Sequence, residues 1–198
     1  MAIRRDVFEK LDIREKWRGT LSDDFTVTSA MKAAEMPIVF VPQALTASVE
    51  DCSFREMLEF TTRQMKITRV YATRLWLMSF LGSGLFCVVM AAALLITILS
   101  SRNGIEVFSA LLTLGLVSAL SVGKSWLRLK AVRLVLTDYS AELKKQRLPQ
   151  LTLWLLSPFV FLYNSVAALF SRRMIWRGIA YELVSPTETR ILNSDDFR

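Results

Sequence analysis

The chain has 198 residues, of which 53% are hydrophobic and 22% charged, and its formal net charge is +7. This length allows one domain, or a small domain with a membrane region, and the apolar fraction is high for a soluble domain. The absence of histidine excludes histidine-based triads, metal sites and proton switches. The basic residues flank apolar runs, which favours anchoring at an anionic leaflet over nucleic-acid binding.

The first part of the chain is mostly polar and contains short helical and strand patterns. Apolar spacing predicts helices over 2–11 and 23–35. A proline-bounded apolar run predicts a strand at 38–41, and a second strand is predicted at 44–49. These elements indicate the end of an α/β domain, and they contain too little apolar material to form such a domain alone.

The segment 53–73 shows the clearest amphipathic pattern. Ser53 is placed to cap a helix, and Glu56 follows three residues later, as in a capping box. Charged side chains recur at spacings of three and four on one face, opposite a broken apolar stripe. A helix of this kind is typical of a membrane interface.

Three apolar runs follow this segment. The first, 75–101, is long enough to span a bilayer and has Trp76 at its start, where an interfacial indole is expected. After a short polar turn, the second run at about 105–123 lies near the lower length limit for a span. The third run, 150–171, contains Pro158, which leaves open whether it spans the membrane, re-enters it or lies at the interface.

The distribution of Lys and Arg predicts the orientation of these runs. Basic residues are frequent before the first run and in the loop 124–149, whereas the turn between the first two runs carries only Arg102. Positively charged segments stay on the cytoplasmic side. We therefore expect an integral membrane protein with the N-terminal part and the loop 124–149 in the cytoplasm. The predicted organisation is an α/β part at 1–52, an interfacial helix at 53–74, a membrane region at 75–171 and a polar tail at 172–198.

Asp23 and Asp24 are the first candidates for chemistry. A carboxylate at a helix start is held by backbone N–H groups, and a hydroxyl acceptor needs such a base to take its proton. The alternative is structural, because Ser22 or Asp23 is also a suitable N-cap. The residues alone do not decide between these two interpretations.

Two further groups of residues are candidates for binding. Arg63 and Lys66 lie one helical turn apart, where they suit either a diphosphate or an anionic lipid. Trp176, Arg177 and Tyr181 suit either a membrane-interface anchor or a segment that folds back under an active site. Both pairs of alternatives stay open.

Several kinds of site have no sequence signal. The chain has no Gly-rich phosphate loop and no Asp-x-Asp pair of the kind that holds Mg²⁺ or Mn²⁺ against a diphosphate. Cys52 and Cys87 lie in a polar and an apolar segment, so neither a disulfide nor a zinc site is expected. We predict no metal site and no cofactor in this chain.

Taken in order, these segments resemble the C-terminal half of membrane-bound family 2 glycosyltransferases, in their ceramide glucosyltransferase-like branch. Ser22-Asp23-Asp24 resembles the acidic motif of that family, and Arg63-Gln64-Met65-Lys66-Ile67 resembles its (Gln/Arg)-x-x-Arg-Trp motif. Lys66 and Ile67 depart from that motif, since Lys loses bidentate geometry and Ile removes the aromatic surface. The segment 176–189 also resembles the tail of such proteins.

The resemblance implies a specific role for each motif. It implies that 1–52 is the C-terminal part of a GT-A-like catalytic domain, with Asp24 as acceptor base beside Asp23. It implies that Arg63, Gln64 and Lys66 contact the diphosphate of the donor. It further implies a membrane lipid as partner, and a nucleotide sugar with Mg²⁺ or Mn²⁺ only in a longer enzyme that contains the missing N-terminal half.

The sequence therefore leads to one hypothesis and one alternative. The hypothesis is the C-terminal part of an inverting hexosyltransferase that acts on a ceramide-like or other membrane lipid, with no activity expected for this part alone. Met1 is then either an internal methionine of a longer chain or the start of a truncated gene product. The alternative is a non-enzymatic integral membrane anchor or subunit. No nucleic-acid partner is expected under either interpretation.

Overall fold

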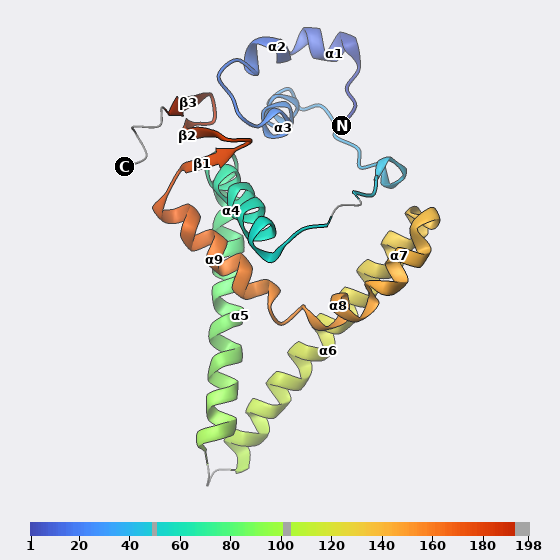
Figure 1. Ribbon diagram of the computed structural model, residues 1–198, viewed down its shortest axis with the longest axis vertical. Helices are drawn as coiled ribbons and strands as arrows, with labels where there is room; N and C mark the ends of the chain where they lie inside the picture. Colours follow the sequence, from blue (N-terminus) through green and yellow to red (C-terminus); the bar gives the residue numbers. More distant parts are fainter. Residues whose placement is uncertain (49–50, 101–103, 193–198) are drawn as a thin grey trace. The chain divides into compact units, whose positions relative to one another are not determined.

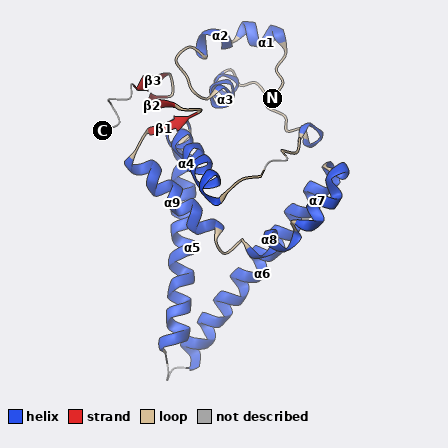
Figure 2. Cartoon of the chain, in the orientation of Figure 1, coloured by secondary structure: helices blue, strands red, loops and turns tan. Residues whose placement is uncertain are grey.

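The computed structural model describes residues 1–48, 51–100 and 104–192 as a mostly helical chain with one small sheet (Figure 1). Helices account for nearly all of its regular structure, and the strands are confined to the C-terminal end (Figure 2). Contacts within the chain define two compact units. The first contains Met1–Phe40, Cys52–Ser79 and Tyr163–Arg198, and the second contains Val41–Asp51 and Phe80–Leu162.

Three short helices form the N-terminal part. They are α1 (Arg5–Lys10), α2 (Ile13–Lys16) and α3 (Asp23–Ala33). Ile13, Val27 and Ala30 are buried together and form a small core. The helix predicted over the first residues is shorter than expected, and α2 follows after Asp12, which has a φ of 48°. The helix predicted at 23–35 is confirmed and ends two residues earlier.

The two strands predicted before residue 50 are wrong. Residues 38–41 lie in a loop, with side chains between 51% and 78% exposed, and η1 (Pro42–Ala44) follows them. A strand needs a neighbour for its backbone N–H and C=O groups, and the described residues contain no strand before β1. The run 38–41 therefore has strand-forming side chains without a partner strand. Residue 49, at the end of the second predicted strand, lies outside the described residues.

Two helices follow with only Ala72 between them, α4 (Phe54–Tyr71) and α5 (Thr73–Leu99). The first confirms the predicted amphipathic helix. α5 and α6 (Gly104–Val135) are each long and apolar enough to cross a membrane. The polar turn predicted between these two helices falls mainly on residues 101–103, which lie outside the described residues.

Most of the basic loop predicted at 124–149 is helical. α6 continues to Val135 because residues 124–135 are mainly Leu, Lys, Arg and Val without Pro or Gly to end the helix. Three short helices follow. They are η2 (Thr137–Tyr139), α7 (Ser140–Lys145) and α8 (Arg147–Thr152). Within the second unit, Arg128 Nη2 donates to Gln150 Oε1 at 3.5 Å and joins α6 to α8.

The third apolar run does not form one spanning helix. α8 ends at Thr152, and α9 (Ser157–Phe170) contains 14 residues. At about 1.5 Å per residue, α9 is roughly 21 Å long and shorter than the hydrocarbon core of a bilayer. Pro158 is its second residue, a position at which the missing N–H costs no hydrogen bond. As a single straight helix, α9 is therefore too short to cross a bilayer.

The segment predicted as a polar tail folds into an antiparallel sheet. Its strands are β1 (Arg173–Trp176), β2 (Ile179–Ser185) and β3 (Glu188–Leu192), in the order β1-β2-β3. Met174 and Leu183 of this sheet are buried with Ile67 of α4. This core fixes the sheet on α4 within the first unit (Figure 1).

Candidate functional site

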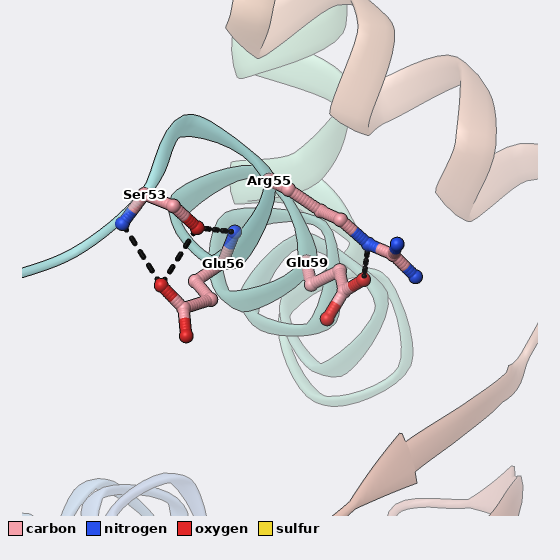
Figure 3. A network of polar contacts seen from close by, with 4 residues as sticks. All are labelled: Ser53, Arg55, Glu56 and Glu59. Atoms are coloured by element: carbon pink, nitrogen blue, oxygen red, sulfur yellow. Dashed lines mark hydrogen bonds and ion pairs between the residues drawn. The ribbon is translucent and has the colours of Figure 1, made fainter.

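The first turn of α4 is fixed by a capping box (Figure 3). Ser53 Oγ accepts a hydrogen bond from the Glu56 backbone N–H at 3.3 Å, and Glu56 Oε2 accepts one from the Ser53 backbone N–H at 2.8 Å. Hydrogen bonds from the Ser53 hydroxyl and backbone N–H lower the pKa of Glu56. Beside this turn, Arg55 Nε donates to Glu59 Oε1 at 2.8 Å. Two backbone N–H groups at the start of α4 are thereby satisfied.

A pocket of about 710 Å³ lies beside α4 in the first unit and is bounded by the β1–β2 hairpin and Tyr163. The described residues that line it include one acidic side chain, Glu59, which is already paired with an arginine. Five basic residues line the same pocket: Arg55, Arg63, Lys66, Arg173 and Arg177. A wall with this excess of positive charge suits an anionic ligand.

Lys66 and Arg63 reach the pocket from neighbouring turns of α4. Lys66 Nζ donates to the backbone carbonyl of Arg173 at 2.6 Å, and burial lowers the pKa of Lys66. The guanidinium carbon of Arg63 lies 5.3 Å from the centroid of the Phe60 ring. α4 therefore presents one partly buried ammonium and one guanidinium supported by an aromatic ring.

The opposite wall of the pocket is the turn between β1 and β2. Arg177 and Gly178 form this two-residue turn, and both have positive φ, at 51° and 78°. Positive φ at both central residues is typical of a type I′ hairpin. The turn fixes the position of Arg177 at the pocket.

α9 is joined to α4 and to the start of α5 by side-chain hydrogen bonds. They run from Thr62 Oγ1 to Asn164 Oδ1 (2.7 Å), from Arg69 Nη1 to Leu169 O (2.7 Å) and from Trp76 Nε1 to Ser165 O (3.2 Å). Asn164 and Ser165 are fully or almost fully buried, so these bonds satisfy groups that are costly to bury unpaired. This connection places Tyr163 at the pocket wall.

The acidic pair lies at the first turn of α3. Ser22 is the N-cap, and its side chain accepts a hydrogen bond from Phe25 N, while Asp23 and Asp24 are exposed. Tyr71, the last residue of α4, accepts hydrogen bonds at its hydroxyl from Leu21 N (2.8 Å) and Ser22 N. No local sequence pattern predicts this contact, which attaches the turn before the acidic pair to the end of α4.

The structure brings some of the candidate residues together and separates others. Arg63, Lys66 and Arg177 line one pocket. Asp23 and Asp24 are not among the residues that line it, and Gln64 is exposed elsewhere on α4.

The aromatic candidates lie beside the pocket. The ring centroids of Trp176 and Tyr181 are 6.5 Å apart, and Tyr181 also packs against the core between α4 and the sheet. The C-terminal segment thus folds back onto α4.

The pocket is also lined by three residues that were not candidates from the sequence: Arg55, Arg173 and Tyr163. Arg55 shares its spacing with Arg63 and was detectable as a member of the same helical face. Arg173 lies at the end of β1 opposite the turn, where it pairs with Glu182, so its place at the pocket depends on how the sheet packs against α4. Tyr163 had no local signal, because its place depends on how α9 packs against α4.

No group of three or more Cys, Asp or Glu side chains that could hold a metal ion occurs among residues 1–48, 51–100 and 104–192. A divalent cation bound in a protein needs several oxygen ligands, commonly from carboxylates. The described residues therefore contain no such cluster of their own for Mg²⁺ or Mn²⁺.

The chain was compared with known proteins. The family model for glycosyl transferase family 21 matches residues 1–189. No curated protein and no solved structure matches the chain in these comparisons. The family match includes the acidic pair, α4, both long apolar helices and the hairpin.

Proposed function

Because the chain belongs to glycosyl transferase family 21, we propose that it takes part in transferring a sugar from a nucleotide diphosphate sugar to a hydroxyl of a membrane lipid. The observation that carries this proposal is the cationic pocket on α4. Positive groups that face a developing phosphate charge are a strong form of catalysis. α5, which is long enough to span a membrane, directly follows α4 and suits a lipid acceptor.

In the proposed reaction, the lipid hydroxyl oxygen attacks the anomeric carbon of the sugar, and the bond from that carbon to the diphosphate oxygen breaks. Asp24 takes the hydroxyl proton, and its exposed position at the first turn of α3 supports this role. Arg63 and Lys66 stabilise the departing diphosphate. The reaction inverts the anomeric carbon, and the N-terminal part and residues 124–149 face the cytoplasm.

Apart from the diphosphate contacts, we assign neither nucleoside nor metal contacts to the described residues of this chain. In the proposal, a nucleotide-binding half with an Asp-x-Asp pair supplies both, so the chain acts as the C-terminal, acceptor-side part of the enzyme. The acceptor is ceramide or another membrane lipid with a free hydroxyl.

The test is sugar transfer to extracted membrane lipid by the chain joined to a nucleotide-binding half, with Asp24→Asn as the variant. Asp23→Asn is the matched control, since both carboxylates are exposed in the same helical turn and interact alike with the helix dipole. We expect kcat to fall by about 10²- to 10⁴-fold for Asp24→Asn only. Unchanged turnover would remove Asp24 from the mechanism. An absence of transfer by the wild-type protein would favour a non-enzymatic anchor or subunit.

A further inference from the structure

Trp176 contacts two guanidinium groups that come from different elements. The centroid of its ring lies 5.9 Å from the guanidinium carbon of Arg63 on α4 and 5.7 Å from that of Arg177 in the β1–β2 turn. Both distances are within the range of cation–π attraction. One aromatic ring therefore links the two walls of the pocket.

The two arginines line the pocket, whereas Trp176 itself does not. Cation–π contact uses the flat face of a guanidinium group and leaves the N–H donors at its edge available for an anion. Neither arginine forms an ion pair with a described carboxylate. The pair therefore offers two planar sets of donors that carboxylates of the described chain do not occupy.

The hairpin fixes Arg177 in a backbone conformation that residues other than glycine rarely adopt. Its φ of 51° is left-handed, and the pairing of Trp176 with Ile179 closes the turn around it. Such conformations persist where the surrounding structure over-determines them, and they cluster at functional sites. The hydrogen bond from Lys66 Nζ to Arg173 O also connects α4 to β1.

The position of Ile67 explains why the aromatic side chain comes from the hairpin. Ile67 occupies the aromatic position of the motif that 63–67 resembles, and its side chain is buried with Met174 and Leu183, only 8% exposed. It does not line the pocket. Trp176 is the aromatic side chain that contacts the arginines of both walls.

We propose that Trp176 is a positioning residue that orients Arg63 and Arg177 as a two-armed clamp for a diphosphate group. Arg177 is then a second anion contact, supplied by the C-terminal hairpin. This inference rests on the proposed function and extends it from α4 to the sheet.

The experiment is calorimetric titration of the full chain, in nanodiscs of phosphatidylcholine, with inorganic pyrophosphate. The variants are Arg63→Ala, Arg177→Ala, Trp176→Leu and Trp176→Phe. Arg190→Ala is the control, because Arg190 lies in the same sheet, outside the pocket and paired with Glu188. We expect the Kd to rise about tenfold for the first three variants, and much less for Trp176→Phe, which keeps an aromatic face. Circular dichroism checks that each variant is folded.

The outcomes separate this inference from the proposed function. If Arg63→Ala weakens binding while Trp176→Leu and Arg177→Ala do not, the clamp is overturned and α4 alone holds the diphosphate. If no variant weakens binding, or the wild-type chain binds no pyrophosphate, the pocket is not the diphosphate site. Equal affinity for sulfate and pyrophosphate at the same ionic strength would also overturn the clamp, since nonspecific attraction then explains binding. The role of Asp24 is tested separately by transfer.

Discussion

Lys66 occupies the position at which the resembled motif has arginine, and its surroundings are those of a partly buried cation. Its ammonium group donates to Arg173 O and lines the pocket. An ammonium is a compact charge with rotatable donors, whereas arginine offers a rigid fork and stays protonated at any physiological pH. Lysine in place of arginine at this position therefore makes the charge of the pocket sensitive to pH.

Burial lowers the pKa of Lys66 from 10.5, so the side chain loses its proton at a lower pH than an exposed lysine. We expect the affinity of the chain for pyrophosphate to fall as the pH rises through this lowered pKa. Lys66→Arg should keep its affinity over the same range, because the guanidinium stays charged. Titrations with pyrophosphate at stepped pH values measure the affinity profile of the wild-type chain and of Lys66→Arg. Identical profiles would contradict the assignment of Lys66 as a contact of the diphosphate.

The same shift sets the direction of a stability effect. Between the lowered pKa and 10.5, the unfolded chain binds more protons at Lys66 than the folded chain does. The contribution of Lys66 to the free energy of unfolding therefore rises with pH in that window.

At the scale of elements, local rules predicted what depends on local sequence. The Ser53 cap and the spacing of charges predicted α4. The three-residue spacing of Arg63 and Lys66 predicted that they share one face of this helix. The strand signal at 38–41 failed because a strand also needs a neighbour, which composition does not reveal. Arg173 and Tyr163 reach the pocket only through the packing of β1 and α9, so no pattern within a window of residues predicts them.

The N-terminal loop approaches the β2–β3 turn closely at Gly19. The φ of Gly19 is 74°, and a Cβ atom there would lie 2.9 Å from the carbonyl oxygen of Thr187. Gly19→Ala should therefore lower the free energy of unfolding by about 2–4 kcal/mol, from backbone strain and the clash together. Thermal unfolding of the full chain in detergent measures the effect.

Gly178→Ala is the matched control for this prediction. Gly178 also has a left-handed φ, at 78°, but a Cβ atom there would meet no atom within 4 Å. We expect only the strain of the left-handed conformation, about 1–2 kcal/mol. Equal losses of stability in the two variants would show that Thr187 can move away at little cost.

At the scale of the whole molecule, the two long helices and the charges around them predict a topology. α5 and α6 have the length and apolar character of membrane spans. The end of α6 is helical as well as basic, with Lys124, Arg128, Lys130 and Arg133 within it. Basic residues near the ends of spans remain in the cytoplasm. Two crossings would then place both the pocket-bearing part and the basic end of α6 on the cytoplasmic side.

The two native cysteines provide a direct test of this topology. Cys52 is exposed just before α4, and Cys87 is buried within α5. In intact cells we expect no reaction of the wild-type chain with a membrane-impermeant maleimide, because the predicted topology places Cys52 in the cytoplasm and Cys87 is buried within α5. Permeabilised cells should show labelling that Cys52→Ser abolishes.

An added cysteine at the other end of α5 and α6 completes the test. Ile105 is 85% exposed in the first turn of α6. On the Cys52→Ser background, Ile105→Cys should react in intact cells, because two crossings place it outside. Labelling of Cys52 in intact cells would show that the chain has the opposite orientation in the membrane. If both Ile105→Cys and Cys52 reacted only after permeabilisation, α5 would not cross the membrane. The proposed lipid acceptor would then lose the support of a membrane-spanning α5.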